Sequence, residues 1–213
     1  MRENEYFPEK KLRRFPQLTN VVLVGLPGSG KSVIGKHLAW QLGLGFFDLD
    51  AAIEVAQKKN IAEIFLEQGV QAFRDFESCG IAQLLSIRNH VVSVGGGALE
   101  IDKNLQNLMS VGVLIWIDTP VTALAWRLTQ NVMELKKRPL FADLCKESDR
   151  SYRRLTLQTR LEGLLAERGR GYESAAITFR DSASPPEVCA RRLIHMLDRY
   201  FNRKKHGKNS SHS

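Results

Sequence analysis

One short glycine-rich segment constrains this chain more than any other feature. Residues 25–32 read GLPGSGKS and follow the apolar run VVLV at 21–24. The segment matches the pattern G-x-x-x-x-G-K-[ST], and the run before it is typical of a buried parallel strand. Residues 32–42 then show the apolar spacing of a helix, which we expect to end at Gly43. A strand, a glycine loop and a helix in this order predict a phosphate-binding loop (P-loop).

The chemistry of such a loop follows from its backbone. Glycines let successive amides surround phosphate oxygens, and the helix N-terminus adds its positive end. The pattern predicts that Lys31 reaches the β- and γ-phosphates of a nucleoside triphosphate and that Ser32 binds Mg²⁺. A glycine-rich turn without a ligand is the alternative, and the lysine, the serine and the flanking elements count against it. Because the sequence has no guanine-reading N-K-x-D and only 213 residues, we expect a small phosphate acceptor, not a GTPase or a motor.

The bulk composition narrows the class of protein. Charged residues make up 25% and hydrophobic residues 43% of the chain, as in ordinary globular domains. No apolar stretch suits a membrane span and the N-terminus is too charged for a secretory signal, so we expect a cytoplasmic protein. Three scattered cysteines predict reduced thiols and no metal cluster. The net charge of +8 fits either nucleic acid or an anionic small substrate.

Strand-like and helix-like segments alternate along the chain. We expect strands at 21–24, 45–47, 91–94, 111–117 and 175–179, with helices between them and a last helix at 186–200. This alternation predicts an α/β fold with a parallel sheet covered on both faces. Residues from about 131 to 171 are polar, basic and helical, which predicts a mobile lid. We expect a flexible extension at 1–17, one domain at 18–201 and a basic disordered tail at 202–213.

Three further groups of residues are candidates for chemistry. Asp48 and Asp50 follow the strand 45–47, so one carboxylate could face Mg²⁺ and the other an acceptor hydroxyl, although Asp50 could simply cap the next helix. Arg74 could bind a substrate carboxylate with Glu77 holding it, or could be solvated. Gly95 begins a triple glycine after a strand, where a ligand could approach the backbone. The lid and its border carry five arginines: Arg127, Arg138, Arg160, Arg168 and Arg170.

The ordered set of motifs is more specific than any one of them. GLPGSGKS, D-x-D after an FF strand, FR-x-x-E, S-x-GGG and RPL together resemble the shikimate kinase family, from about Val21 to Leu197. That family consists of P-loop kinases of the nucleoside monophosphate kinase class, with a five-stranded parallel sheet. The resemblance implies that the protein uses ATP and Mg²⁺ to phosphorylate the 3-hydroxyl of shikimate, a step of aromatic amino-acid biosynthesis.

The resemblance also implies a role for each matching residue. Asp50 would contact the shikimate hydroxyls and act as, or orient, the base, with Lys31 and Arg138 as the other catalytic groups. Ser32 would bind Mg²⁺ directly, and Asp48 would do so through water. The ATP site would comprise Gly28, Ser29, Gly30, Lys31, Ser32, Val33, Arg127, Arg138 and Ser184. The shikimate site would comprise Asp50, Arg74, Gly95, Gly96, Gly97 and an arginine late in the lid, for which Arg168 fits best and Arg160 and Arg170 are rivals.

The lid departs from the family pattern and keeps two alternatives open. Thirty positions separate Arg138 from Arg168, and the segment VMELKK lies between Asn131 and Arg138. An altered lid leaves room for another small hydroxy-acid kinase, such as one resembling gluconate kinase. A non-catalytic nucleotide-binding regulator is the alternative from another class, and the intact Lys31, Asp48, Asp50 and Arg74 count against it. We expect a monomer with a small-molecule substrate that binds neither nucleic acid nor membrane.

Overall fold

A computed structural model of the protein describes residue 15 and residues 18–180 and 183–209. Its centre is a five-stranded sheet in the order β2-β3-β1-β4-β5, in which every neighbouring pair is parallel. The strands are β1 (Asn20–Val24), β2 (Gly45–Asp48), β3 (His90–Ser93), β4 (Val113–Ile117) and β5 (Ile177–Phe179). The prediction of an α/β fold with a five-stranded parallel sheet is therefore confirmed.

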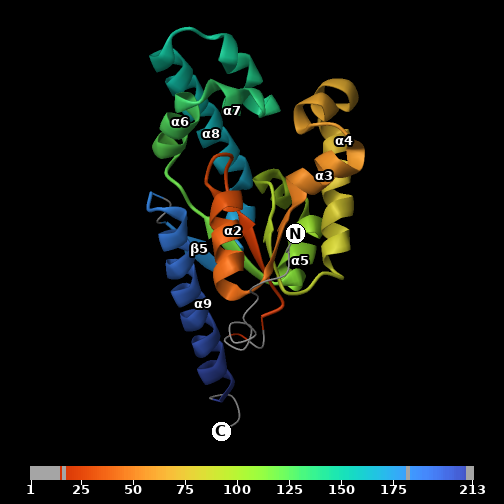
Figure 1. The fold of residues 1–213 in the computed structure, drawn as a ribbon, viewed down its shortest axis with the longest axis vertical. Helices are drawn as coiled ribbons and strands as arrows, with labels where there is room; N and C mark the ends of the chain where they lie inside the picture. The colour runs from red at the N-terminus through yellow and green to blue at the C-terminus, as the bar shows by residue number, and fades with distance from the viewer. Residues whose placement is uncertain (1–14, 16–17, 181–182, 210–213) are drawn as a thin grey trace, which may run out of the picture.

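Helices connect these strands, as parallel pairing requires. Those before β4 are α2 (Lys31–Leu42), α3 (Leu49–Gln57), α4 (Ile61–Leu84), the 3₁₀ helix η1 (Gly96–Glu100) and α5 (Asp102–Val111). Those after it are α6 (Val121–Gln130), α7 (Val132–Lys136), the 3₁₀ helix η2 (Pro139–Lys146), α8 (Arg150–Glu173) and α9 (Pro186–Asn209). Figure 1 shows α2 and α9 on one side of the sheet and α4 and α5 on the other.

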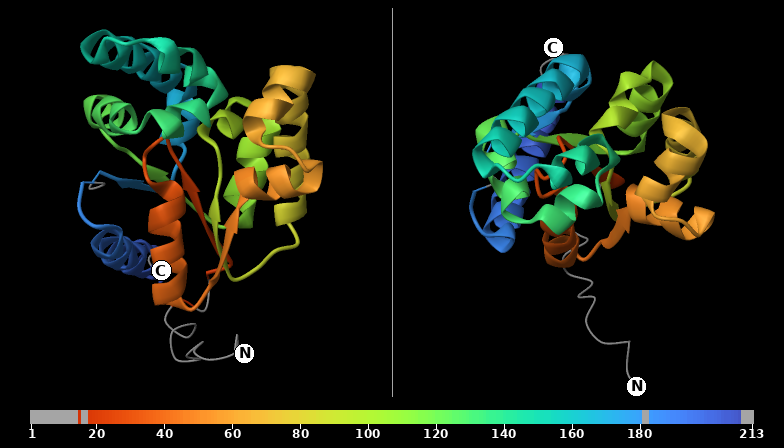
Figure 2. Two further views of the ribbon diagram at one scale, coloured as in Figure 1. Left: turned by 45° about the horizontal axis from the view of Figure 1, so that its top comes forward. Right: turned by 90° about the horizontal axis from the view of Figure 1, so that it is seen from above.

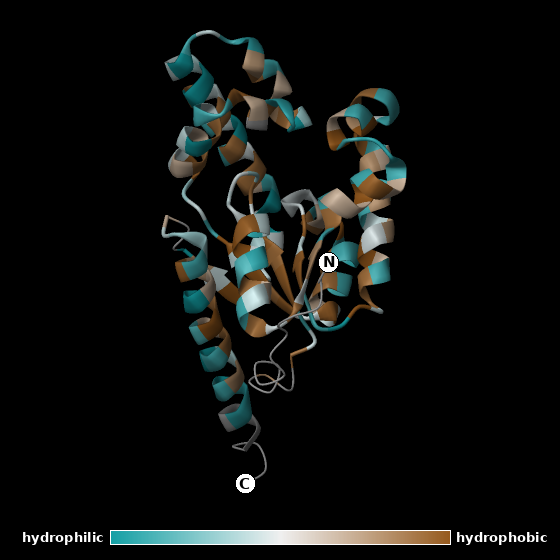
Figure 3. Cartoon of the chain, in the orientation of Figure 1, coloured by the Kyte–Doolittle hydropathy of each residue, from teal (hydrophilic) through white to brown (hydrophobic). Residues whose placement is uncertain are grey.

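Two apolar clusters explain why helices cover both faces. Val21 and Leu23 of β1 belong to one cluster with residues of α2 and α9, whereas Val22 and Val24 belong to the other with residues of α4, α5, α6 and α8. Side chains of a strand alternate between faces, so a strand buried on both sides must be apolar at every position. Figure 3 shows the central strands mostly in the hydrophobic colour, with more mixed helices around them.

The structure differs from the sequence-based expectation at three elements. Helix α5 extends to Val111, so the strand expected from residue 111 begins at Val113 instead. The apolar spacing predicts separate helices up to Phe65 and from Val70 onward, whereas α4 runs through both segments with a kink at Gly69, where φ is 82°. Helix α9 continues to Asn209, so residues 202–209 of the expected disordered tail are helical.

The terminal segments can be compared only in part. Most of the expected extension at 1–17 lies outside the described residues, as do residues 210–213 of the tail. Phe15 is described and is buried, with its ring centroid 5.7 Å from that of Phe201 on α9. This residue therefore belongs to the apolar cluster around α9 and not to a flexible extension.

The expected lid consists of α7, η2 and α8, at the top of Figure 1 and seen from above in Figure 2. Leu135, Phe141 and Leu144 of α7 and η2 are buried in the main core. The end of α8 reaches the sheet, because Tyr172 stacks on Trp116 of β4 with ring centroids 5.2 Å apart. Tyr172, the residue just past the expected lid boundary at 171, is therefore part of the core, and the extent of the lid stays a prediction.

The sheet brings the sequence motifs to one edge. The P-loop follows β1, Asp48 ends β2, and the triple glycine follows β3. Parallel strands end on the same side, which is where ligands bind in sheets of this kind. Within the described part of the chain, no helix has both the length and the apolar character needed to cross a membrane.

Candidate active site

The P-loop joins β1 to α2 and leaves the start of that helix open. Gly30 is the N-cap residue in the left-handed conformation, with φ 92°, and no described side chain caps α2. Gly28 also has a positive φ, and a Cβ there would lie 3.0 Å from the Leu128 side chain. Only glycine adopts such a backbone without strain. The first-turn amides and the positive end of the helix are therefore directed into the loop, where a phosphate would bind.

Lys31 lies inside this loop. Its Nζ donates to the carbonyl oxygens of Gly25, at 2.9 Å, and Leu26, at 3.2 Å. Burial lowers the pKa of Lys31 from 10.5 to about 8. The negative charge of Asp50 opposes this shift, and the positive charge of Arg138 adds to it. An ammonium group this poorly solvated gains strongly from an anionic partner such as a phosphate.

Ser32 and Asp48 are in direct contact. Ser32 Oγ donates to Asp48 Oδ2 at 2.6 Å and lies 3.3 Å from Ser93 Oγ. Asp48 Oδ1 accepts from the backbone amides of Asp50 and Ala51, so Asp48 is the N-cap of α3. The alternative that Asp50 is the cap is thus wrong, because Asp50 stands in the first turn.

The oxygen pair of Ser32 and Asp48 fits Mg²⁺ in kind, since hydroxyl and carboxylate oxygens are hard donors. The described residues contain no group of three or more His, Cys, Asp and Glu side chains that would hold a metal alone. This arrangement is expected for Mg²⁺, which commonly takes one or two protein oxygens together with substrate phosphates and water.

A cavity of about 810 Å³ surrounds the P-loop. Arg127 of α6 borders it and donates from Nη1 to the carbonyl oxygen of Gly28 at 2.8 Å. Ser184, in the segment before α9, also lines this cavity. The cavity is lined by Gly28, Ser29, Gly30, Lys31, Ser32, Val33, Ile34, Asp50, Ser93, Arg127, Leu128, Asn131, Arg138 and residues 183–186. The structure thus brings all nine residues predicted for ATP together in one cavity.

A second cavity, of about 120 Å³, lies next to the first. Its polar wall is formed by Asp50, Arg74, Glu77, Gly95, Gly96, Gly97, Lys137, Arg138 and Arg168. Its apolar wall is formed by Pro27, Ile61, Phe65, Phe73 and residues 139–141. Asp50 and Arg138 line both cavities. A group held in the second cavity would therefore meet a phosphate held in the first at these two side chains.

Asp50 has the surroundings of a reactive carboxylate. Its Oδ1 is buried and has no hydrogen-bond partner among the described residues. Burial raises the pKa of Asp50, as does the charge of Asp48, whereas Lys31 and Arg138 oppose the rise. A buried carboxylate oxygen with unused acceptor capacity can take a hydrogen bond, and then a proton, from a substrate hydroxyl.

Arg74 is held in place by Glu77, one turn later on α4. Arg74 Nη1 and Glu77 Oε2 form an ion pair, and the Glu77 side chain is only 1% exposed. Burial raises the pKa of Glu77 to about 7, although Arg74 opposes the rise. The alternative of a solvated Arg74 is wrong, because its side chain is 16% exposed and borders the second cavity.

The three candidate arginines late in the lid have different surroundings. Arg168 is buried, lines the second cavity and donates from Nε to Glu100 Oε1 at 2.8 Å. Arg160 instead donates to both carboxylate oxygens of Asp143, at 2.7 and 2.6 Å. Arg170 is exposed and is not among the described residues that line either cavity. Of the three, the structure brings only Arg168 to the other predicted substrate residues.

Some residues of the site had no clear signal in the sequence. Ile61 and Phe65 have the helical spacing of ordinary core residues, yet they line the second cavity beside Phe73 of the FR-x-x-E motif. Lys137 also lines the second cavity, although it lies in the VMELKK segment, which departs from the family pattern. Glu100 follows the triple glycine by three positions, and nothing in its neighbourhood predicts its contact with Arg168.

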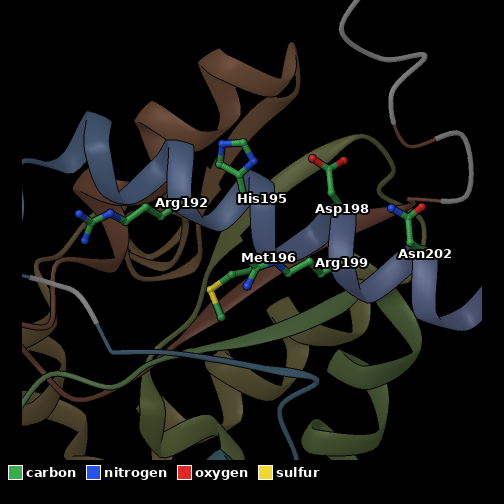
Figure 4. Close-up of a pocket in the computed structure, with 6 residues that line it drawn as sticks. All are labelled: Arg192, His195, Met196, Asp198, Arg199 and Asn202. Atoms are coloured by element: carbon green, nitrogen blue, oxygen red, sulfur yellow. The ribbon is translucent and has the colours of Figure 1, made fainter.

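A further cavity, of about 570 Å³, lies along α9. Figure 4 shows its lining residues, all from that helix: Arg192, His195, Met196, Asp198, Arg199 and Asn202. None of the residues predicted for ATP, Mg²⁺ or the acceptor borders this cavity. The candidate active site is therefore the pair of cavities at the P-loop.

Comparisons with known proteins agree with this site. A family model described as shikimate kinase matches residues 27–198. The shikimate kinase of Chlorobium chlorochromatii is 37% identical over 181 residues, which cover 85% of this chain and 92% of that protein. The shikimate kinase of Gloeobacter violaceus is 37% identical over 174 residues, covering 82% and 90%.

A solved structure is similar as well. The shikimate kinase of Acinetobacter baumannii, determined in complex with shikimate, has a TM-score of 0.75 and 29% identity, covering 87% of this chain and 96% of that chain. Together with the family match over most of the sequence, this likeness confirms the resemblance and does not favour a gluconate kinase-like enzyme or a non-catalytic regulator. The chain belongs to the shikimate kinase family.

Proposed function

We propose that this protein transfers the γ-phosphoryl group of ATP to the 3-hydroxyl of shikimate, giving ADP and shikimate 3-phosphate. The observation that carries the proposal is the meeting of two cavities at Asp50 and Arg138. One cavity has the P-loop of a nucleotide site, and the other is a small space lined by cationic side chains and by two carboxylates, those of Asp50 and Glu77. Family membership supports the same reaction.

The second cavity is the proposed acceptor cavity, and its lining matches the chemistry of shikimate. A small cyclic acid with three hydroxyls requires cationic donors at one end and a hydroxyl acceptor at the other. Arg74 and Arg168 border the same cavity and would bind the carboxylate, because a planar guanidinium pairs well with a planar carboxylate. Phe65 and Phe73 would pack against the ring, and Asp50 would accept from its hydroxyls.

The transfer itself requires position and charge more than covalent chemistry by the protein. In the proposed step, the acceptor oxygen bonds to the γ-phosphorus, the bond to the ADP oxygen breaks, and Asp50 takes the hydroxyl proton. Lys31 and Arg138 would stabilise the charge on the transferring group, since both act on Asp50 and on each other across the junction of the cavities. Mg²⁺, with Ser32 and Asp48 as its protein oxygens, would neutralise phosphate charge when bound.

The lid segment supplies Arg138, and we propose that it covers the site during transfer and keeps water out. Residues 137–141 already border the acceptor cavity, so a small inward movement would close it. We also propose that the protein acts as a monomer, because one chain provides every side chain named for the reaction. A molar mass of about twice 24.1 kDa in light scattering would contradict that part of the proposal.

ADP release measured with shikimate, with gluconate and without acceptor tests the proposed function. We expect shikimate, but not gluconate, to stimulate ADP release. We also expect shikimate 3-phosphate to form, identified by its mass. Asp50→Asn should lower kcat by roughly 10²–10⁴-fold, because an amide cannot act as the base, while ATP binding stays close to that of the wild type. Asp75→Asn is the matched control, since Asp75 is an exposed residue of α4 that lies outside both cavities.

Two outcomes would contradict the proposal. Wild-type protein that binds ATP but shows no ADP release with shikimate is not a shikimate kinase. Full activity in the Asp50→Asn variant would leave the reaction in place but remove the role given to that carboxylate.

A further inference from the structure

The short helix η1 contacts both Arg74 and Arg168, two of the three arginines that line the acceptor cavity. Gly97, the last of the three glycines, faces Arg74 so closely that a Cβ at Gly97 would lie 2.2 Å from Arg74 Nη2. The last residue of η1, Glu100, accepts from Arg168 Nε at 2.8 Å through Oε1. The same Oε1 lies 3.9 Å from Arg74 Nη2. One carboxylate oxygen thus contacts both guanidinium groups proposed to bind the substrate carboxylate.

Arg168 depends on this contact more than a surface arginine would. Its side chain is 4% exposed, whereas that of Glu100 is 36% exposed. A buried guanidinium needs an anionic or accepting partner, because it has lost most of its water. Glu100 bonds at Nε, so the terminal fork of Nη1 and Nη2 can still meet another carboxylate. The contact therefore orients Arg168 without occupying the end that would bind the substrate.

The close approach of α8 to η1 explains how the pair forms. Gly171 of α8 is packed on Leu99, where a Cβ would lie only 2.6 Å from the Leu99 Cβ. Arg168 precedes Gly171 by three positions and so lies on the same face of the helix. Leu99 and Glu100 are consecutive, so the glycine contact places Glu100 next to Arg168. Gly171, the second glycine of the sequence RGRG, thus allows α8 to pack closely against η1.

We propose that Glu100 is a positioning residue for recognition of the acceptor's carboxylate, an inference that rests on the proposed function. Glu77 holds Arg74 and Glu100 holds Arg168, so both guanidinium groups are ordered before the acceptor arrives. Ordering a binding group in advance strengthens binding because less conformational freedom is lost on association. Glu100 also repels an incoming carboxylate, but solvent screens that repulsion at a partly exposed side chain, whereas the bond to Arg168 is direct.

The experiment compares Glu100→Ala and Glu100→Gln with the wild type, using shikimate and its uncharged methyl ester. Glu167→Ala is the matched control, because Glu167 is an exposed glutamate next to Arg168 in sequence and lies outside the acceptor cavity. We expect Glu100→Ala to raise the KM for shikimate by about tenfold, with kcat and the KM for ATP within about twofold of wild type. Glu100→Gln keeps an accepting oxygen, so its KM should lie between those of the wild type and the alanine variant.

The ester separates positioning from general damage to the fold. Its inhibition constant against shikimate turnover should change by less than about twofold in Glu100→Ala, because the ester offers no charge to the arginines. All assays are run below the melting temperature of each variant, and the glutamine variant serves if the alanine variant does not fold.

Several results would overturn the proposal. An unchanged or lower KM for shikimate in Glu100→Ala would contradict positioning, and so would an equal loss for acid and ester. A glutamine variant no better than alanine would show that the accepting oxygen is not what matters. These outcomes are distinct from a failure of the proposed function, in which the wild type itself shows no ADP release with shikimate.

Discussion

Arg160 donates to both carboxylate oxygens of Asp143, from Nη1 at 2.7 Å and from Nη2 at 2.6 Å. The same Nη1 also donates to the carbonyl oxygen of Leu140 at 3.2 Å. This hydrogen bonding holds the pKa of Asp143 below its ordinary value. The guanidinium of Arg160 is therefore fully engaged with η2, whereas Arg168, two turns later on α8, borders the acceptor cavity.

Matched lysine substitutions test this difference between the two arginines. Arg168→Lys keeps the charge but loses the planar fork, so we expect the KM for shikimate to rise by roughly tenfold or more. Arg160→Lys should change that KM by less than about twofold, because an exposed ion pair contributes little. Steady-state kinetics with varied shikimate decide the question, and the reverse order of effects would assign the carboxylate to Arg160.

Gly97 predicts a steric effect on Arg74. A Cβ at Gly97 would lie 2.2 Å from Arg74 Nη2 and 2.3 Å from Nη1, so Gly97→Ala must displace a guanidinium that Glu77 holds. We expect a higher KM for shikimate and an unchanged KM for ATP, both measured by steady-state ADP release.

Gly163→Ala is the control for that substitution, because nothing lies within 4 Å of a Cβ at this position of α8. It should leave both KM values unchanged and raise the free energy of unfolding by about 0.5–1 kcal/mol, since alanine favours a helix. If Gly97→Ala behaved like Gly163→Ala, the close packing of Arg74 on the triple glycine would have no role in binding.

The pKa of Lys31 predicts how ATP use depends on pH. Burial lowers this pKa to about 8, so the side chain is cationic below that pH and increasingly neutral above it. A neutral amine cannot offset phosphate charge, and we expect kcat/KM for ATP to fall as the pH rises through about 8. With ATP saturating, kcat should decline only at higher pH, because bound phosphate stabilises the ammonium. A kcat/KM that stays constant up to pH 9.5 would contradict this prediction.

Glu77 predicts a pH dependence of stability. Its pKa is raised from 4.5 to about 7 in the folded protein, mainly by burial, so the folded state binds this proton more tightly than the unfolded state. The stabilisation from this group is complete below about pH 4.5 and is lost as the pH rises to about 7. The loss is about 3 kcal/mol, at about 1.36 kcal/mol for each unit of the pKa difference.

Glu77→Gln isolates that contribution, because its amide does not titrate. The variant lacks the ion pair that wild type forms with Arg74 when Glu77 is ionised. Relative to wild type, however, its free energy of unfolding should improve between pH 5 and pH 7.5, as measured by urea denaturation at each pH. Parallel curves for the two proteins over that range would rule out Glu77 as the titrating group.

The sequence by itself determined the local features of this protein. The P-loop, the strands at its borders and the order of the motifs depend on short-range properties: glycine conformation, apolar periodicity and the positive end of a helix. These properties predicted the strands of the parallel sheet, and the family resemblance carried by the ordered motifs implied the residues of the ATP cavity. The sheet then brings the ends of β1, β2 and β3 to one edge, which is also a consequence of parallel pairing.

Only the tertiary structure decided which of several candidate residues of the same type borders the acceptor cavity. The sequence pattern favoured Arg168 but left Arg160 and Arg170 as rivals, and acids far along the chain separate Arg168 from Arg160: Glu100 lies 68 positions from Arg168, and Asp143 lies 17 from Arg160. The assignment of Asp48 as helix cap and Asp50 as buried carboxylate likewise depends on how α3 leaves β2. Burial and long-range pairing set the charge and orientation of these groups, and neither property can be read from residues that are neighbours in sequence.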